Sequence, residues 1–173
     1  MAWTTPATVV ADSTELTASL WNQQVRDNTS FLYSPASCAL DHTGNQTISN
    51  GTWTSVTFTA PDLFDTDNMH STSSNTSRIT INTAGIYLLT ANIEWTSQAT
   101  GFRASRIYVD GSTIISSDQR TTVSGDSTIS ALSGIYRFTA GQYVELQGYQ
   151  NTGAPLNIIS GQTNFAASWL GQF

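Results

Sequence analysis

A period-2 pattern of apolar residues between positions 86 and 95 constrains the fold of this chain more than any other sequence feature. Successive side chains of a β-strand point to opposite sides of the sheet, so residues at every second position share a face. One face of this segment is wholly apolar, and it carries Tyr87, Leu89, Ala91, Ile93 and Trp95. Such a face needs cover, and the pattern therefore predicts a long strand in a sheet packed on one side.

Similar alternation continues from about Cys38 to the C-terminus. The candidate strands are Thr47–Ile48, Thr52–Thr59, Arg78–Ile81, Ile86–Thr96, Ala104–Val109, Thr113–Ile115, Thr128–Phe138, Tyr143–Tyr149, Leu156–Ile159 and Asn164–Leu170. Asp110 and Gly111 stand between two alternating segments, which is the pattern of a tight hairpin. Many short strands separated by Gly-rich and Asn-rich turns predict an all-β fold, either a sandwich or a jelly roll.

Residues 1–35 carry the helical pattern of this chain. Asp12 and Glu15 have the spacing of a capping box. After them an apolar stripe follows at helical spacing through Trp21, Val25, Asn28 and Leu32, with Leu16 and Leu20 beside it. Pro35 ends the pattern. A single short helix is marginal in water, so the stripe must contact its own domain, other copies or a larger assembly. We therefore divide the chain into an N-terminal segment, 1–35, and a β domain, 36–173.

Charge and composition exclude several partner classes. The net charge is −6, the chain has no lysine, and its six arginines are scattered. Nucleic acids and anionic membranes need clustered basic residues, so we expect neither as a partner. Cys38 is the sole cysteine, which rules out an intrachain disulfide, and we expect it to be buried. Its first residues, MAWTTPAT, lack the features of a secretory signal.

We expect no catalytic residues and no enzyme activity. His42 and His70 both lie in polar, loop-like sequence, and there is no Gly-x-Ser-x-Gly motif. Glu94 and Glu145 fall in predicted strands and would serve a glycosidase only if they faced each other across a cleft.

One acidic segment suggests a metal. Asp62, Asp65, Asp67 and Asn68 lie close together in the sequence, and Ca²⁺ prefers such oxygen ligands. Their spacing is not that of an EF-hand, however, so a solvated acidic loop is the competing interpretation. Calcium is the only cofactor that the sequence suggests.

Three segments of the β region together resemble a known superfamily: NTAGIYLLTANI from Asn82, FTAGQYVEL from Phe138 and NFAASWL from Asn164. Their order and spacing are similar to those in the jelly rolls of tumour necrosis factor and of the complement globular heads. Leu89, Gln142 and Ala167 depart from the usual aromatic, acidic and glycine residues. The resemblance covers about 135 of the 173 residues and implies a jelly-roll β-sandwich that forms compact homotrimers. The candidate trimer-interface residues are Tyr87, Tyr143, Tyr149, Phe165 and Trp169.

The N-terminal segment resembles the opening of tailed-bacteriophage virion proteins. These begin with a Trp and Pro segment and continue into a short helix, and the matching residues here are Ala18, Trp21, Asn22, Val25, Arg26, Asp27 and Asn28. The resemblance implies an anchor to capsid or tail proteins through Trp3, Leu16, Leu20, Trp21, Val25, Arg26 and Leu32.

Together the two resemblances predict a homotrimeric virion structural protein on the surface of a phage particle, as a head fibre, a decoration protein or a tail-associated protein. One alternative is a receptor-binding tip that recognises host-surface glycans. Another is an extracellular ligand similar to tumour necrosis factor.

Overall fold

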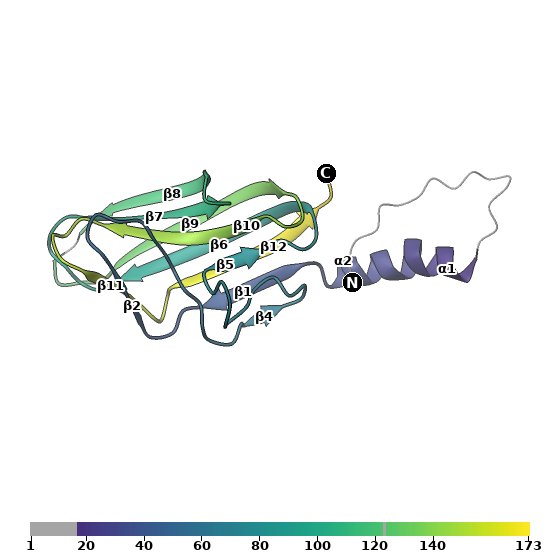
Figure 1. The fold of residues 1–173 in the computed structure, drawn as a ribbon, viewed down its shortest axis with the longest axis horizontal. Helices are drawn as coiled ribbons and strands as arrows, with labels where there is room; N and C mark the ends of the chain where they lie inside the picture. The colour runs from purple at the N-terminus through teal and green to yellow at the C-terminus, as the bar shows by residue number, and fades with distance from the viewer. Residues whose placement is uncertain (1–16, 123) are drawn as a thin grey trace.

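The computed structural model describes residues 17–122 and 124–173, which form a helix followed by a β-sandwich (Figure 1). The helix runs through α1 (Ala18–Trp21), a π-helical segment η1 (Asn22–Asp27) and α2 (Asn28–Tyr33). Thr17 caps its start, where the Thr17 hydroxyl accepts a hydrogen bond from the Leu20 N–H at 3.1 Å. The expected capping box at Asp12 and Glu15 lies outside the described residues. No helix in the described ranges is long and apolar enough to cross a membrane.

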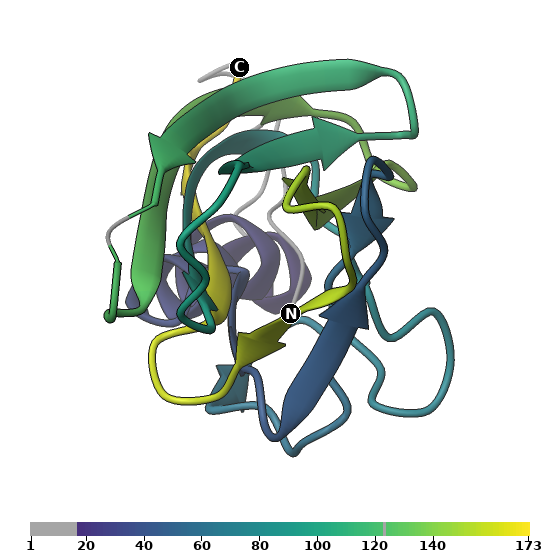
Figure 2. The ribbon, with the colours of Figure 1, turned by 90° about the vertical axis from the view of Figure 1, so that its left-hand side faces the viewer.

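Within the described residues twelve strands form two sheets, and every pairing between these strands is antiparallel. The seven-stranded sheet contains β1 (Ser37–Asp41), β2 (Asn45–Ile48), β4 (Phe64–Asp65), β6 (Gly85–Trp95), β9 (Thr128–Phe138), β11 (Leu156–Ile159) and β12 (Asn164–Gly171). The five-stranded sheet contains β3 (Thr54–Ser55), β5 (Arg78–Thr80), β7 (Phe102–Val109), β8 (Thr113–Thr121) and β10 (Tyr143–Gln150). The sheets pack face to face, and β8 lies beside β9 along one side of the sandwich (Figure 2).

The long strand predicted from the alternating segment is β6, at the centre of the seven-stranded sheet. It pairs with β9 along one edge, and with β12 and β11 along the other. Its apolar phase, from Tyr87 to Trp95, is buried in the core. From the other sheet, Ile107, Val144 and Leu146 belong to the same core cluster. This arrangement confirms a strand that is covered on one face.

Several strands differ from the sequence expectation: the predicted strand Thr52–Thr59 is reduced to β3, Thr54–Ser55, and β4 was not predicted. The sequence predicts Thr113–Ile115, but β8 continues to Thr121 because β7 offers a partner along this length. β1 was not among the predicted strands, since its segment is short and buried at three successive positions instead of alternating. The predicted hairpin is confirmed: Asp110 and Gly111 have φ of 48° and 65° and connect β7 to β8.

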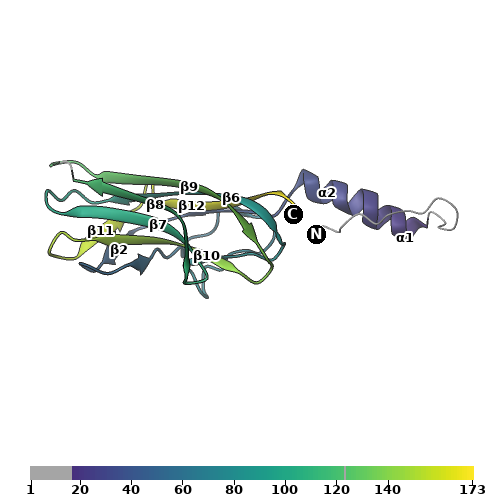
Figure 3. The same ribbon diagram turned by 90° about the horizontal axis from the view of Figure 1, so that it is seen from above.

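The helix joins the sandwich through its last turn. Phe31 is buried, and its ring meets Trp169 of β12 edge to face, with ring centroids 4.9 Å apart. Trp169 in turn donates from its indole N–H to the Ala84 carbonyl oxygen at 3.2 Å and covers Gly85, where an added Cβ would lie 2.0 Å from the indole nitrogen. The rest of the helix projects beyond the end of the sandwich (Figure 3). The core therefore begins at Phe31, inside the segment that the sequence assigned to the anchor.

Candidate functional site

Three of the five candidate trimer-interface residues lie inside the protomer. Tyr87, Phe165 and Trp169 belong to the core cluster. The Tyr87 hydroxyl donates to the Thr83 carbonyl oxygen at 2.6 Å, which satisfies its polar group inside the core. We therefore correct the assignment of these residues, because a side chain buried within one copy does not contact a second. Aromatic character identified them, but the inward phase of β6 and β12 determines where they point.

The other two candidates are partly exposed on the outer face of the five-stranded sheet. Tyr143 stacks with Arg78, whose guanidinium carbon lies 3.9 Å from the ring centroid. Tyr149 lies between Trp53 and Phe102, with ring centroids 5.3 Å and 5.7 Å away. Both tyrosines occupy the phase of β10 opposite to core residues Val144 and Leu146.

A different surface carries the exposed apolar residues that the sequence analysis did not single out. We define the apolar sheet face as Phe64, Leu88, Ile129, Ile135 and Leu170, on the outer side of the seven-stranded sheet. Leu88 lies directly opposite Ile135 of β9 and Ser168 of β12, so these side chains share a face. Ile135 is 63% exposed and Leu170 is 53% exposed. Exposed aliphatic side chains that lie next to one another on a sheet face, as Leu88 and Ile135 do, are typical of a protein–protein contact.

The signal for this face is present in the sequence, in the outward phase of the same strands. Leu88 on β6, and Ile129 and Ile135 on β9, fall between the core positions, where an exposed sheet would carry polar residues. Small residues lie between the two isoleucines of β9, since Ala131 and Ser133 occupy the outward positions from Ile129 to Ile135. Apolar residues at some outward positions of an otherwise polar phase indicate that part of this face is covered.

The helix presents the predicted anchor stripe to solvent. Trp21 is 51% exposed and Leu32 is 58% exposed, while Val25 and Arg26 are also exposed and Leu20 is partly exposed. Arg26 pairs with Asp27 at 2.9 Å. Trp3 and Leu16, the other two candidate anchor residues, lie outside the described residues. In the described chain the stripe lies on the projecting part of the helix (Figure 3).

The acidic segment does not assemble its carboxylates around one point. The Asp62 carboxylate lies 2.7 Å from Nδ1 of His70. The Asp65 carboxylate accepts from the backbone N–H groups of Asp67 and His70, at 3.1 Å and 2.9 Å. Asp67 accepts from the Thr83 hydroxyl at 2.9 Å. Each carboxylate thus holds a separate part of the loop.

Within the described ranges, no group of three or more His, Cys, Asp or Glu side chains is arranged to hold a metal ion. The expected calcium site at Asp62, Asp65, Asp67 and Asn68 therefore lacks a common coordination centre. Asn68 has a φ of 51° and contributes its backbone carbonyl to Asn82, whose side chain donates to it at 3.0 Å.

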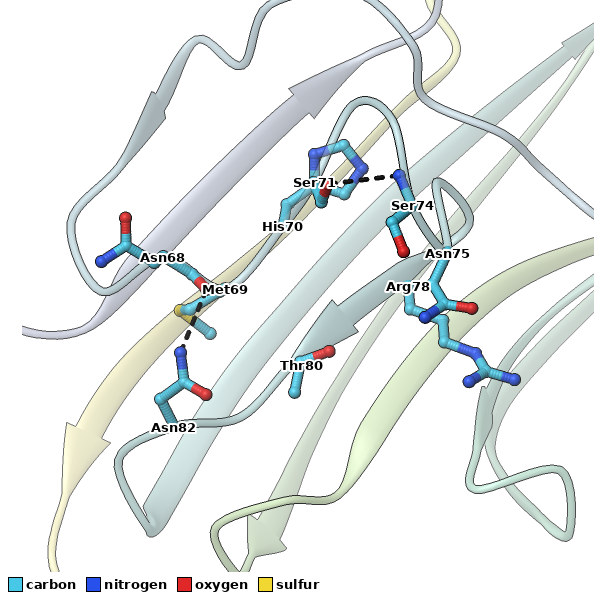
Figure 4. A pocket seen from close by; sticks show the side chains of 9 residues that line it. All are labelled: Asn68, Met69, His70, Ser71, Ser74, Asn75, Arg78, Thr80 and Asn82. Carbon is cyan, nitrogen blue, oxygen red and sulfur yellow. Dashed lines mark hydrogen bonds between the residues drawn. The ribbon is translucent and has the colours of Figure 1, made fainter.

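Beside this loop lies a polar pocket of about 240 Å³ (Figure 4). Its wall consists of the loop from Asn68 to Asn75 on one side, with Arg78, Thr80 and Asn82 on the other. Arg78 is engaged elsewhere, since its Nε donates to Glu145 at 3.4 Å. The pocket holds amide, hydroxyl and imidazole groups without a nucleophile paired to a base, and so it does not indicate catalysis.

The remaining reactive groups are held in structural roles. Cys38 is buried, and burial raises the pKa of its thiol well above the ordinary value, with Asp65 and Asp62 adding to the shift. Nδ1 of the buried His42 lies 2.9 Å from the Thr57 carbonyl oxygen. Glu145 lies under Ser77 and Arg78 on the five-stranded sheet, whereas Glu94 belongs to the other sheet. The two glutamates that a glycosidase would need are therefore not brought together across a cleft.

Comparison with solved structures identifies the fold. Eiger, a tumour necrosis factor of S. frugiperda, matches with a TM-score of 0.62 and 11% identity over 80% of this chain and 94% of that one. Murine APRIL at pH 5.0 matches with a TM-score of 0.61 and 14% identity, over 78% and 98%. The globular domain of zebrafish complement 1qA matches with a TM-score of 0.58 and 11% identity, over 80% and 99%.

No protein-family model and no curated protein sequence matches the chain. At these identities the structural matches establish the fold alone. The chain has the jelly-roll sandwich of the tumour necrosis factor and complement globular-head domains, as its sequence predicted.

Proposed function

We propose that this chain is a virion structural protein of a tailed bacteriophage, a homotrimer that attaches through its N-terminal segment and displays its jelly roll outward. The supporting observation is the separation of two exposed apolar surfaces. One is the stripe on the projecting helix, and the other is the apolar sheet face. The first suits attachment to capsid or tail proteins, and the second suits contact between copies.

Self-association is supported by the chemistry of the apolar sheet face. Ile135 and Leu88 lie side by side near the middle of β9 and β6, with small residues of β12 next to them. Small neighbours let another sheet approach closely, and burial of exposed aliphatic side chains stabilises association by about 25 cal/mol per Å². Three copies around a closed axis would cover this face on every subunit.

The attachment role rests on the helix and on the similarity of its sequence to phage virion proteins. An isolated helix of this length gains little stability from its backbone alone. Trp21 and Leu32 nevertheless remain more than half exposed in the protomer. A groove on a capsid or tail protein would cover these side chains and fix the helix in place.

Light scattering on the full chain tests self-association. A homotrimer of the 18.6 kDa chain would give three times that mass. Ile135→Asp places a charge on the apolar sheet face, and we expect it to reduce the mass to that of one chain while the melting curve stays cooperative. Arg120→Gln, at an exposed position on the other sheet, is the control and should remain trimeric. A wild-type monomer would contradict the proposal, and so would a trimer unaffected by Ile135→Asp.

A particle-binding assay tests attachment separately. Val25→Asp alters the exposed stripe of the helix, and we expect a trimeric, folded protein that no longer joins phage particles. Gln23→Ala, also exposed on the helix but outside the stripe, is the matched control. Loading of the Val25→Asp protein at the wild-type level would exclude the stripe as the anchor. An extracellular signalling ligand with the same fold would remain off the particles altogether.

A further inference from the structure

The outer face of the five-stranded sheet carries an ordered row of side chains that the proposed structural role does not use. We define the aromatic–arginine ladder as Tyr108, Arg106, Trp53, Tyr149 and Phe102, in spatial order. The guanidinium carbon of Arg106 lies 4.1 Å from the Tyr108 ring centroid and 4.2 Å from that of Trp53. Trp53 then contacts Tyr149, which stacks on Phe102 with an interplanar angle of 26°.

The ladder joins three segments that are distant in sequence. β7 supplies Phe102, Arg106 and Tyr108 at alternate outward positions, and β10 supplies Tyr149. Trp53 comes from the segment just before β3. The register places Gln147 directly opposite Arg106, so both lie on the same outer face.

The guanidinium of Arg106 is fixed on three sides. The rings of Tyr108 and Trp53 both lie against it, and its Nε donates to Oε1 of Gln147 at 2.8 Å. Gln147, only 9% exposed, is itself held by a hydrogen bond from its Nε2 to the Ser55 hydroxyl at 3.1 Å. An arginine held in this way loses little further conformational entropy when it binds a ligand.

The other edge of the guanidinium has no internal partner. In residues 17–122 and 124–173 no carboxylate forms an ion pair with Arg106, and its two terminal nitrogens donate no hydrogen bond. On the same sheet Arg78 is neutralised by Glu145, which leaves the ladder with one unpaired positive charge on a chain of net charge −6. The terminal nitrogens of a guanidinium match the two oxygens of a carboxylate in geometry and charge.

We propose that the aromatic–arginine ladder binds saccharides that carry a carboxylate, such as uronic or sialic acids. Arg106 receives the carboxylate at its terminal nitrogens. Arg106 and Tyr149 lie against the Trp53 ring, so the part of the indole that stays exposed, 36% of the side chain, contacts the apolar C–H groups of the same or the next sugar ring. Tyr149 and Phe102 extend the row in the direction of the following residues of the glycan.

The shape of the site selects a saccharide over a peptide. The ladder is a row on a sheet face, and a sugar ring offers a flat apolar side and a polar rim that suit such a row. The ladder and the apolar sheet face lie on opposite outer sides of the sandwich, so a trimer built on one leaves the other open. The proposal does not depend on attachment to a particle, because the purified chain is sufficient to test it.

Titration of the full-chain protein with defined probes tests this site. The probes are a galacturonic acid trisaccharide, sialyllactose and the uncharged galactose trisaccharide, each followed through the indole N–H resonances by NMR. We expect saturable binding of at least one acidic probe, with a dissociation constant of about 1 mM or lower for a small exposed site. The uncharged trisaccharide should bind at least tenfold more weakly.

Variants assign the binding to the ladder. Arg106→Gln and Trp53→Ala should each weaken binding of the acidic probe by about tenfold or more, and Arg106→Lys should also weaken it because the planar fork is lost. Arg120→Gln, an arginine already paired with Asp118, is the matched control and should bind as the wild type does. Melting curves confirm that each variant is folded, and Trp53→Phe, which keeps a ring at this position, should retain part of the affinity.

Four results would overturn the proposal: no binding of either acidic probe, equal binding of the uncharged trisaccharide, binding unchanged by Arg106→Gln, or displacement of the acidic probe by an equimolar acidic peptide. None of these results bears on the mass of the protein or on its loading onto particles. The saccharide site and the structural role therefore fail or succeed independently.

Discussion

The outer faces of the two sheets show how one fold supports two kinds of surface. Both faces are formed by the outward phase of antiparallel strands. On the seven-stranded sheet, Leu88 and Ile135 stand exposed among small residues. On the five-stranded sheet, Arg106 and Trp53 stack on each other, and Gln147 lies almost buried beneath the ladder.

The two faces differ in whether their outward side chains contact one another within the protomer. The ladder residues contact one another, so the five-stranded sheet has an ordered outer layer within a single protomer. The apolar sheet face has no such layer in the described chain, and its aliphatic side chains gain most from burial against another molecule. A face whose side chains are ordered by contacts within the protomer is suited to binding a soluble ligand. A face of exposed aliphatic side chains is suited to assembly with other copies.

The largest change in the free energy of unfolding is expected for a substitution in β10, the strand that lies under part of the ladder. Gly148 lies on β10 between Gln147 and Tyr149, and a Cβ added there would lie 2.8 Å from the Trp95 ring. Gly148→Ala should therefore destabilise the protein by about 1–3 kcal/mol, because either Trp95 or the strand must move. Urea unfolding at fixed protein concentration measures this. Gly171→Ala, with no atom within 4 Å of its added Cβ, should stay within about 0.5 kcal/mol of wild type.

Removal of a ladder side chain should lower the free energy of unfolding at every protein concentration. Trp53→Ala deletes the contacts with Arg106 and Tyr149, and we expect a loss of about 1–2 kcal/mol, since each stacked or cation–π pair contributes about 0.5–1.5 kcal/mol. Thermal melts over a hundredfold range of concentration are the measurement. A loss that disappears on dilution would instead show that Trp53 is buried between copies, and the distinction between the two faces would fail.

Alkaline pH tests whether the interior, instead of either outer face, limits stability. The thiol of Cys38 has a raised pKa in the folded protein, caused first by burial and then by Asp65 and Asp62, whereas in the unfolded chain it ionises near its ordinary value of 9.0. The stabilisation is therefore complete below pH 9 and declines as the pH rises above it, by at most about 1.4 kcal/mol per unit. Cys38→Ala should remove this slope between pH 9 and 10. An unchanged slope would assign alkaline unfolding to other groups.

The smallest effect is expected on the apolar sheet face of the isolated protomer. Ile135→Thr shortens a side chain that is already 63% exposed and keeps a β-branched residue in the strand, so at concentrations where the protein is monomeric it should change the free energy of unfolding by less than about 0.5 kcal/mol. At concentrations where the wild type is trimeric, the same change should lower the melting temperature. A large loss at high dilution would mean that Ile135 supports the protomer itself.

Local periodicity accounts for much of what the sequence predicted correctly. The alternation in β6, the turn at Asp110 and Gly111, and the helix ending before Pro35 each depend on neighbouring residues, and all three are present in the structure. β1 and β4 were harder to foresee, because each is short and becomes a strand through partners far along the chain.

The candidate sites were predicted less well than the fold. Tyr87 and Phe165 were selected as large aromatic residues, yet both belong to the inward phase and fill the core. Asp62, Asp65 and Asp67 were selected for proximity in sequence, but each is directed to a different partner in the loop. Residue type and spacing indicate which chemistry is available, while the direction of each side chain depends on the loop or strand that carries it.

By itself the sequence determined which residues of each strand alternate, where the chain turns and that its N-terminal segment carries a helix. These properties follow from backbone geometry over a few residues. Only the tertiary structure decided that Trp53, Arg106 and Tyr149 would meet, and that Leu88 and Ile135 would share an exposed face. Strand order and register decide such meetings, because they join segments whose separation along the chain gives no local signal of contact.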